Sequence, residues 1–153
     1  MKAELINPIL AATAGVLRQL AKLEVVRGRS LLLNNPRPSH EVAIFVGITG
    51  AQSGHAIYSM NYESALKLAA RLMPGSDEAL VRSEYRDALG EVANMITGVA
   101  IQQFMRGAAG VDLTTPMVAD LRHNAAPDMP DMPTLALNLY TVAGLIEIHF
   151  AMK

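Results

Sequence analysis

The sequence has no cysteine, few aromatic residues and almost no net charge. The lack of cysteine excludes disulfides, thiol catalysis and cysteine-ligated zinc. Its 13 basic and 14 acidic residues leave no positive surplus for phosphate binding, so we expect no nucleic-acid partner. No apolar run is long enough to span a bilayer and the N-terminus lacks a signal-peptide pattern, which predicts a cytoplasmic protein without a membrane partner.

The remaining composition is that of a globular chain. It has 153 residues, of which 51% are hydrophobic and 18% charged, so it can bury a core of its own. Because only 5% of the residues are aromatic, that core should be mostly aliphatic. We expect a single domain over residues 1–153.

Three segments have the apolar spacing of helices. Their expected ranges are 7–23, 62–73 and 76–106. Asn7, Asn61 and Ser76 are the residues expected to cap them, because each can accept a hydrogen bond from a free backbone N–H of the first turn. The glycine-containing stretch 107–110 should end the third helix, which is about 45 Å long at 1.5 Å per residue.

The other apolar runs are short and predict strands. Their expected ranges are 24–33, 42–49, 55–60, 115–121, 134–141 and 145–151. The glycines Gly47, Gly50 and Gly54 lead into a strand and not into a helix N-terminus, which favours a hairpin over a phosphate-binding loop. The fold class is therefore α+β, with an antiparallel sheet of about six strands and three helices on one face.

The third helix carries the strongest functional signal. Asp87, Glu91 and Asn94 fall within roughly 60° of one another on a helical wheel, and Gly98 joins them one turn later. We call these four residues the outer stripe. The opposite face is expected to be core and comprises Leu89, Val92, Ala93, Ile96, Val99, Ala100 and Phe104.

The outer stripe could be an ordinary solvated helix face, but two features argue for more. Asn is unfavourable in mid-helix because its side chain competes for backbone hydrogen bonds. Gly90 and Gly98 each cost up to about 1 kcal/mol relative to Ala, which close approach of another element or a partner would offset. The four histidines are not at metal-ligand spacing, so no metal site is predicted on this chain.

In these features the chain resembles the CheC/CheX family of chemotaxis phosphatases, and its CheX members most. The resemblance covers nearly the whole length and is most specific in the pattern Asp87-x3-Glu91-x2-Asn94. Pro116 lies near the place of a downstream family proline. A single Glu-x-x-Asn is present, which disfavours the two-site arrangement of CheC.

The resemblance implies a phosphatase that acts on phospho-aspartate of a CheY-like receiver domain. Asn94 would position the attacking water, and Glu91 would dock against the receiver's active-site lysine. Asp87 and Gly98 would contact the partner. Mg²⁺ is expected in the receiver's acidic pocket, and no cofactor is expected on this chain.

Two other interpretations remain open. The chain could be a catalytically silent module that binds a receiver or motor-switch protein through the same helix. It could also be a hydrolase with Asp87 and Glu91 as an acid/base pair. The resemblance further implies a homodimer, and the apolar strand 145–150 is the edge expected to pair with its copy. The sequence does not specify which receiver or which pathway is served.

Overall fold

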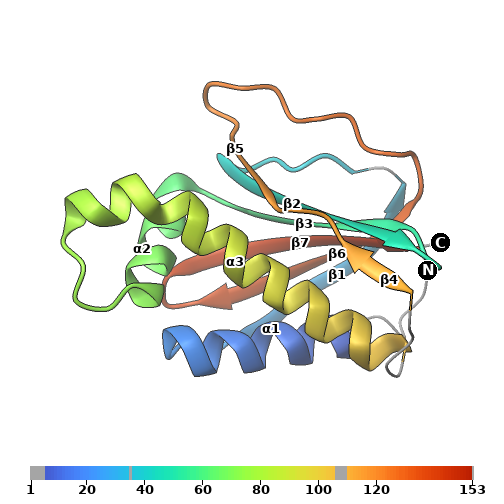
Figure 1. Ribbon diagram of the computed structural model, residues 1–153, viewed down its shortest axis with the longest axis horizontal. Coiled ribbons are helices and arrows are strands. Elements are labelled where there is room, and N and C mark those ends of the chain that lie inside the picture. Colours follow the sequence, from blue (N-terminus) through green and yellow to red (C-terminus); the bar gives the residue numbers. More distant parts are fainter. Residues whose placement is uncertain (1–5, 35, 106–109, 153) are drawn as a thin grey trace.

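The computed structural model describes residues 6–34, 36–105 and 110–152, which form three helices and one antiparallel sheet (Figure 1). In chain order the elements are α1 (Ile6–Ala21), β1 (Val26–Asn34), β2 (Val42–Gly50), β3 (Gly54–Met60), α2 (Tyr62–Leu72), α3 (Glu78–Met105), β4 (Val111–Leu113), β5 (Met117–Asp120), β6 (Pro133–Thr141) and β7 (Gly144–Met152). Within the described residues, no helix combines the length and the apolar character needed to cross a bilayer.

The strands form a seven-stranded sheet in the order β1-β6-β7-β3-β2-β4, and β5 pairs with β2 beside β4. Every pairing is antiparallel, as hairpin connections predict. The expectation that 145–150 is an uncovered edge is wrong, because β7 lies between β6 and β3. The edge strand on the β6 side of the sheet is β1, which pairs only with β6 among the described residues.

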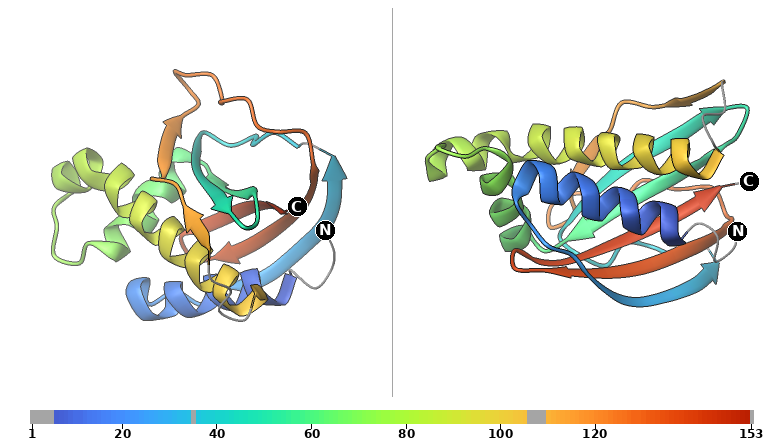
Figure 2. Two further views of the ribbon diagram at one scale, coloured as in Figure 1. Left: turned by 45° about the vertical axis from the view of Figure 1, so that its right-hand side comes forward. Right: turned by 90° about the horizontal axis from the view of Figure 1, so that it is seen from below.

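All three helices cover the same face of the sheet (Figure 2), which confirms the expected fold class. The main core lies between these two layers and is mostly aliphatic. Its most completely buried side chains include Ile9, Leu17, Ile44, Leu89 and Ile148. The alternation of β2 places Ile44 toward the helices and Phe45 toward the other face.

The other face of the sheet has a smaller apolar cluster. Ala43, Phe45 and Ile57 form its centre, and Ala126 and Met129 pack on it from the segment that follows β5. That segment is drawn in orange in Figure 1. A loop therefore covers part of this face, whereas helices cover the opposite one.

The helix caps agree only in part with the sequence prediction. Asn61 caps α2 as expected, with its Oδ1 accepting a hydrogen bond from the Ser64 N–H at 2.8 Å. The cap of α3 is Asp77 and not Ser76, since Asp77 Oδ1 accepts from the Leu80 N–H at 2.8 Å. Asn7 is not the cap of α1 either, because the helix already includes Ile6. The expected stop at 107–110 lies mostly outside the described residues.

The strand predicted over 115–121 is present as the shorter β5, whereas β4, which comes before it, was not predicted; both strands pair with β2. β4 pairs with Ile48–Gly50, and β5 pairs with Val42–Phe45. Between them Thr114 bonds to the backbone of Gly47, and Pro116 has no N–H to donate to a ladder. The interruption lies beside α3, where Thr115 and Pro116 form part of one side of the candidate site.

Candidate active site

The outer stripe lies on α3 away from the core, as the helical spacing predicts. Asp87 and Glu91 are exposed, Gly98 is half-buried, and Asn94 is half-buried too. The inner stripe, which we define as Leu89, Val92, Ala93 and Ile96, is buried against the sheet and α1. The helix therefore separates a packed side from a side open to a partner.

The prediction that Val99 belongs to the core face is wrong. Val99 is 36% exposed, and Met95, one turn earlier on the same side of α3, is 47% exposed. Phe104 is partly buried against the core, as expected. Val99 lies at the border of the apolar arc, and spacing alone does not show where the covering elements end. Met95 and Val99 are therefore two exposed apolar residues on one side of α3.

An open groove runs between α3 and the segment that precedes β5. It is lined by Arg86, Asp87, Gly90, Glu91, Thr115, Pro116 and Val118. The two walls approach closely because residue 90 has no side chain: a Cβ there would lie 3.3 Å from Cγ of Pro116. Gly90 thus permits close approach of another element, which is one of the reasons proposed for its presence in the helix. At Gly98 the nearest side-chain atom is farther, with Leu113 Cδ1 at 3.8 Å from a Cβ position.

Asn94 carries an unusual feature for a surface helix. Its Oδ1 is buried and has no hydrogen-bond partner among the described residues. Leaving such an atom unsatisfied costs about 1–3 kcal/mol, and buried polar groups without partners are rare. Nδ1 of His55 and Nδ1 of His149 are likewise buried without a partner in the described structure, but Asn94 is the one of these three residues that lies on α3.

A buried hydrogen-bond chain fixes the rotation of α3 next to Asn94. Thr97 Oγ1 donates to the Ala93 carbonyl at 2.7 Å, so Tyr58 Oη, 2.7 Å away, is the donor to Thr97. Burial raises the pKa of Tyr58 far above its ordinary value, which keeps this hydrogen in place. The bond ties α3 to β3 of the sheet within one turn of Asn94.

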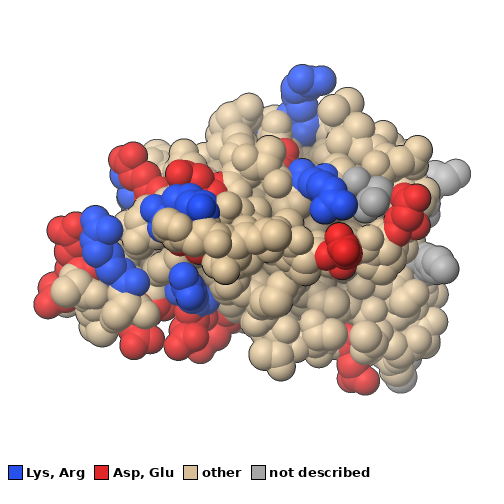
Figure 3. All heavy atoms as spheres, turned by 90° about the horizontal axis from the view of Figure 1, so that it is seen from above, with Lys and Arg blue, Asp and Glu red and all other residues tan. Residues whose placement is uncertain are grey.

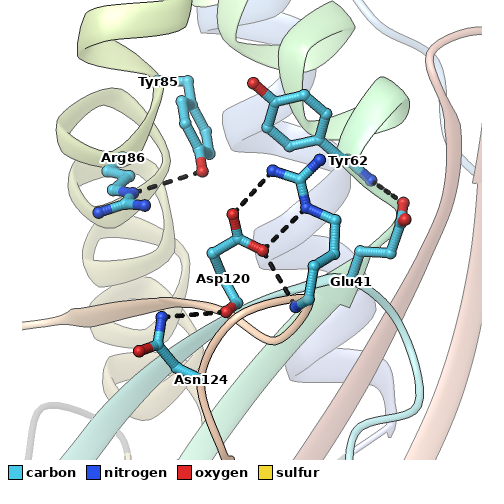
Figure 4. Close-up of polar contacts among 7 residues, drawn as sticks. Glu41, Tyr62, Tyr85, Arg86, Asp120 and Asn124 are labelled. Atoms are coloured by element: carbon cyan, nitrogen blue, oxygen red, sulfur yellow. Dashed lines mark hydrogen bonds and ion pairs between the residues drawn. The ribbon is translucent and has the colours of Figure 1, made fainter.

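A second polar cluster joins α2, α3 and the end of β5 at the other end of the groove (Figure 4). Arg122 makes two side-chain hydrogen bonds to Asp120, at 2.9 and 2.7 Å, and stacks 3.8 Å from the ring centre of Tyr62. These hydrogen bonds hold the pKa of Asp120 at about 2. Tyr62 packs edge-on against Tyr85, whose Oη accepts from Arg86 Nε at 3.3 Å.

Histidines that are distant in the sequence meet on the sheet face opposite the helices. His149 Nε2 lies 3.4 Å and His40 Nε2 3.9 Å from Glu147 Oε1, and the hydrogen bond from His149 lowers the pKa of Glu147. Burial, followed by the charge of His149, lowers the pKa of His55. Residue spacing could not reveal these contacts, because they depend on strand order. No group of three potential ligands suited to a metal ion occurs in the described part of the chain.

The chemotaxis phosphatase CheX family model matches residues 42–129, which is more than half of the chain. The chain belongs to the CheX family. Membership places it among the chemotaxis phosphatases, and the matched range includes the outer stripe and Pro116.

Individual proteins similar to this chain are consistent with membership of this family. The CheY-P phosphatase CheX of Thermotoga maritima is 27% identical over 153 residues, covering 100% of this chain and 98% of the relative. A CheC-like superfamily protein from Shewanella has a similar fold, with a TM-score of 0.82 at 22% identity, covering 100% and 99% of the two chains. The Borrelia burgdorferi CheX–CheY–BeF3–Mg²⁺ complex matches with a TM-score of 0.77 at 22% identity, covering 97% of each chain.

Several features of the site were not visible in the sequence. The partnerless Oδ1 of Asn94 depends on what packs around the helix, and the Tyr58–Thr97 bond joins residues from different elements. Arg86 had no signal of its own, since an exposed helical arginine is common. Two residues gave a hint of the groove: Gly90, whose presence in a helix suggested close approach of another element, and Pro116, because the resemblance placed a proline there.

Proposed function

We propose that the chain hydrolyses the phospho-aspartate of a CheY-like receiver domain, with α3 docked on the receiver's phosphorylation site. The observation that carries this proposal is the half-buried Asn94, with its partnerless Oδ1, next to the exposed Glu91. Family membership and the relative named CheY-P phosphatase support the substrate class. The relative from Borrelia, whose structure is a complex with CheY, supports the partner.

Asn94 is proposed to place one water in line with the phosphorus atom. An acyl phosphate already has a good leaving group, so the reaction needs positioning more than a strong base. A neutral amide does not repel the phosphoryl charge, and it can both accept from and donate to water. When the receiver covers α3, a rotation of the Asn94 amide would turn Oδ1 out of its buried position, and the water would become its partner.

Glu91 is proposed to dock Asn94 in register. Its carboxylate would be repelled by the phosphoryl group unless it meets a cation, and the family resemblance supplies the receiver's active-site lysine. Mg²⁺ would be held by the receiver, so activity should require Mg²⁺ although this chain supplies none of its ligands. Asp87 and Gly98 are proposed to contact the partner beside this pair.

The decisive assay for the function follows decay of a purified phosphorylated receiver with and without the chain. We expect accelerated loss of phosphate in the presence of Mg²⁺ and no activity on a small phosphoester without a receiver. A chain that binds the phospho-receiver without accelerating decay would be the silent binding module. Hydrolysis of the small phosphoester alone would instead favour the acid/base pair of Asp87 and Glu91.

We also propose that the chain forms a homodimer through β1. This strand ends the sheet, so one row of its backbone N–H and C=O groups has no strand partner in the described structure. Its side chains Leu31, Leu32 and Leu33 are exposed, with Leu32 at 60%. Pairing two β1 strands would continue the sheet and leave α3 free for the receiver.

Light scattering at tens of micromolar should therefore give a dimeric mass. Leu32→Lys should shift this mass to the monomer while phosphatase activity is retained, because β1 is not part of the groove. Val142→Lys is the control, since Val142 is exposed in the β6–β7 turn, which lies at the opposite end of β1 from Leu32. A monomeric wild-type chain would contradict the dimer without affecting the proposed reaction.

A further inference from the structure

Arg86 is held at the groove but retains most of its hydrogen-bonding capacity. It lies on α3, one turn before Gly90, and lines the groove together with Asp87, Glu91 and Pro116. Among the described residues its single hydrogen bond is from Nε to Tyr85 Oη. The two terminal amino groups of the guanidinium are therefore available to a partner.

Two nearby arginines differ from Arg86 in this respect. Arg82 is paired with Glu78 at 3.0 Å, and Arg122 uses both Nε and Nη2 on Asp120. Figure 3 shows positive and negative side chains interspersed at this end of the molecule. Arg86 differs from Arg82 and Arg122 because neither of its terminal amino groups has a hydrogen-bond partner among the described residues.

The guanidinium of Arg86 is also supported from within the protein. Its central carbon lies 5.7 Å from the ring centre of Tyr85, a buried residue that packs against Tyr62. A stacked and hydrogen-bonded arginine loses less side-chain freedom on binding than a mobile lysine does. This support makes Arg86 suited to select a particular partner group, because its orientation is set before binding.

The partner group should be a carboxylate. A planar guanidinium binds a carboxylate through two parallel hydrogen bonds. The phosphoryl group itself is excluded, since Arg86 lies about 12 Å along the helix axis from Asn94, at 1.5 Å per residue. By the same distance, the matching carboxylate would lie on the receiver surface outside the acidic pocket that surrounds the phosphorylation site.

We infer that Arg86 is a specificity-determining residue that binds a surface carboxylate of the receiver domain. This inference rests on the proposed function. Glu91 would bind a cation and Arg86 an anion, at positions roughly 7.5 Å apart along the helix axis. Two contacts of opposite sign fix both position and orientation, and a receiver that lacks the matching acidic residue would be rejected.

The test measures affinity separately from catalysis. In an Asn94→Ala background, where little substrate should be consumed, binding of the phosphorylated receiver is titrated for Arg86→Ala, Arg86→Lys and Arg86→Glu. We expect Arg86→Ala to weaken binding roughly 5- to 10-fold, Arg86→Lys less and Arg86→Glu more, as for a bidentate interfacial charge pair. Arg82→Ala is the matched control and should bind like its parent, because Arg82 is paired within its own helix.

Two further measurements identify the carboxylate that Arg86 contacts. The affinity of the parent should fall more steeply with salt than that of Arg86→Ala, and one charge-reversed receiver carboxylate should restore binding to Arg86→Glu. If Arg86→Ala binds like Arg82→Ala, or if no reversed carboxylate rescues Arg86→Glu, the inference is wrong. That outcome leaves the proposed function intact, which fails separately if the chain with Asn94 does not accelerate phosphate loss.

Discussion

The two sides of α3 perform different tasks with the same backbone. The inner stripe of Leu89, Val92, Ala93 and Ile96 is buried and holds the helix to the sheet. The outer stripe of Asp87, Glu91, Asn94 and Gly98 adds no buried apolar area of comparable size. The polar stripe is thus free to serve a reaction, because the buried side of α3, with the Tyr58–Thr97 bond, secures the helix.

Asn94 belongs to the outer stripe but is also partly packed within the protein. Its side chain is half-buried, yet its Oδ1 has no partner in the described structure. A side chain chosen for stability would not leave that atom unsatisfied. The difference between the stripes therefore predicts opposite outcomes of substitution: changes to the inner stripe should unfold the protein, and changes to the outer stripe should affect the reaction.

The largest effect should come from the inner stripe. Leu89 is fully buried, so Leu89→Ala should lower the free energy of unfolding by about 2–5 kcal/mol through lost apolar contact and the cavity left behind. Urea unfolding followed by circular dichroism measures this change. A loss below about 0.5 kcal/mol, which is typical of surface sites, would mean that the inner stripe is not what holds α3.

Glu91→Ala should act on the partner and not on the fold. Removing the carboxylate would leave the receiver lysine unpaired in a closed interface, which weakens association by about 2–5 kcal/mol. The free energy of unfolding should change by no more than about 0.5 kcal/mol, because Glu91 is exposed. Glu63→Ala on α2 is the control, and equal binding by the two variants would remove Glu91 from the docking surface.

A pH titration tests the cluster beside the groove, which belongs to neither stripe. The folded pKa of Asp120, about 2, lies below its ordinary value because Arg122 donates hydrogen bonds to it. Its contribution to stability is present above the ordinary pKa of the unfolded chain and is lost as pH falls through the folded pKa. Unfolding free energy should therefore decrease between about pH 4 and pH 2. Asp120→Asn should reduce this slope, and an unchanged slope would show that other groups cause it.

The smallest effect should come from Asp87. Its side chain is exposed at the groove, so Asp87→Ala should change both stability and turnover by no more than about 0.5 kcal/mol. Turnover of the phospho-receiver measured over a range of concentrations checks this expectation. A loss as large as that of Glu91→Ala would favour the acid/base interpretation of the two carboxylates.

The sequence was a good guide where structure is set locally. The Gly50–Gly54 turn joins β2 to β3 as a hairpin, and Asn61 caps α2. Helical spacing also placed Asp87 and Glu91 on the outside of α3. In each case the signal depends on a few neighbouring residues, so no knowledge of distant contacts was needed.

Prediction from sequence failed where contacts between distant segments determine the structure. β4 exists because Val111–Leu113 meets the end of β2, more than sixty residues away in the sequence. The place of β7 in the sheet depends on strand order, which hydrophobic pattern does not specify. Val99 follows the apolar spacing of the core but emerges at the surface, because periodicity gives a direction and not the extent of the covering layer.

Single-turnover decay of a phosphorylated receiver with Asn94→Ala tests the central claim most directly. At saturating enzyme we expect the rate of phosphate loss to fall on the order of 10²-fold, as for removal of a single positioning group. The free energy of unfolding should be unchanged or higher, because the partnerless buried oxygen is gone. A folded Asn94→Ala variant that retains the full rate would contradict the account, since α3 would then not be the catalytic surface.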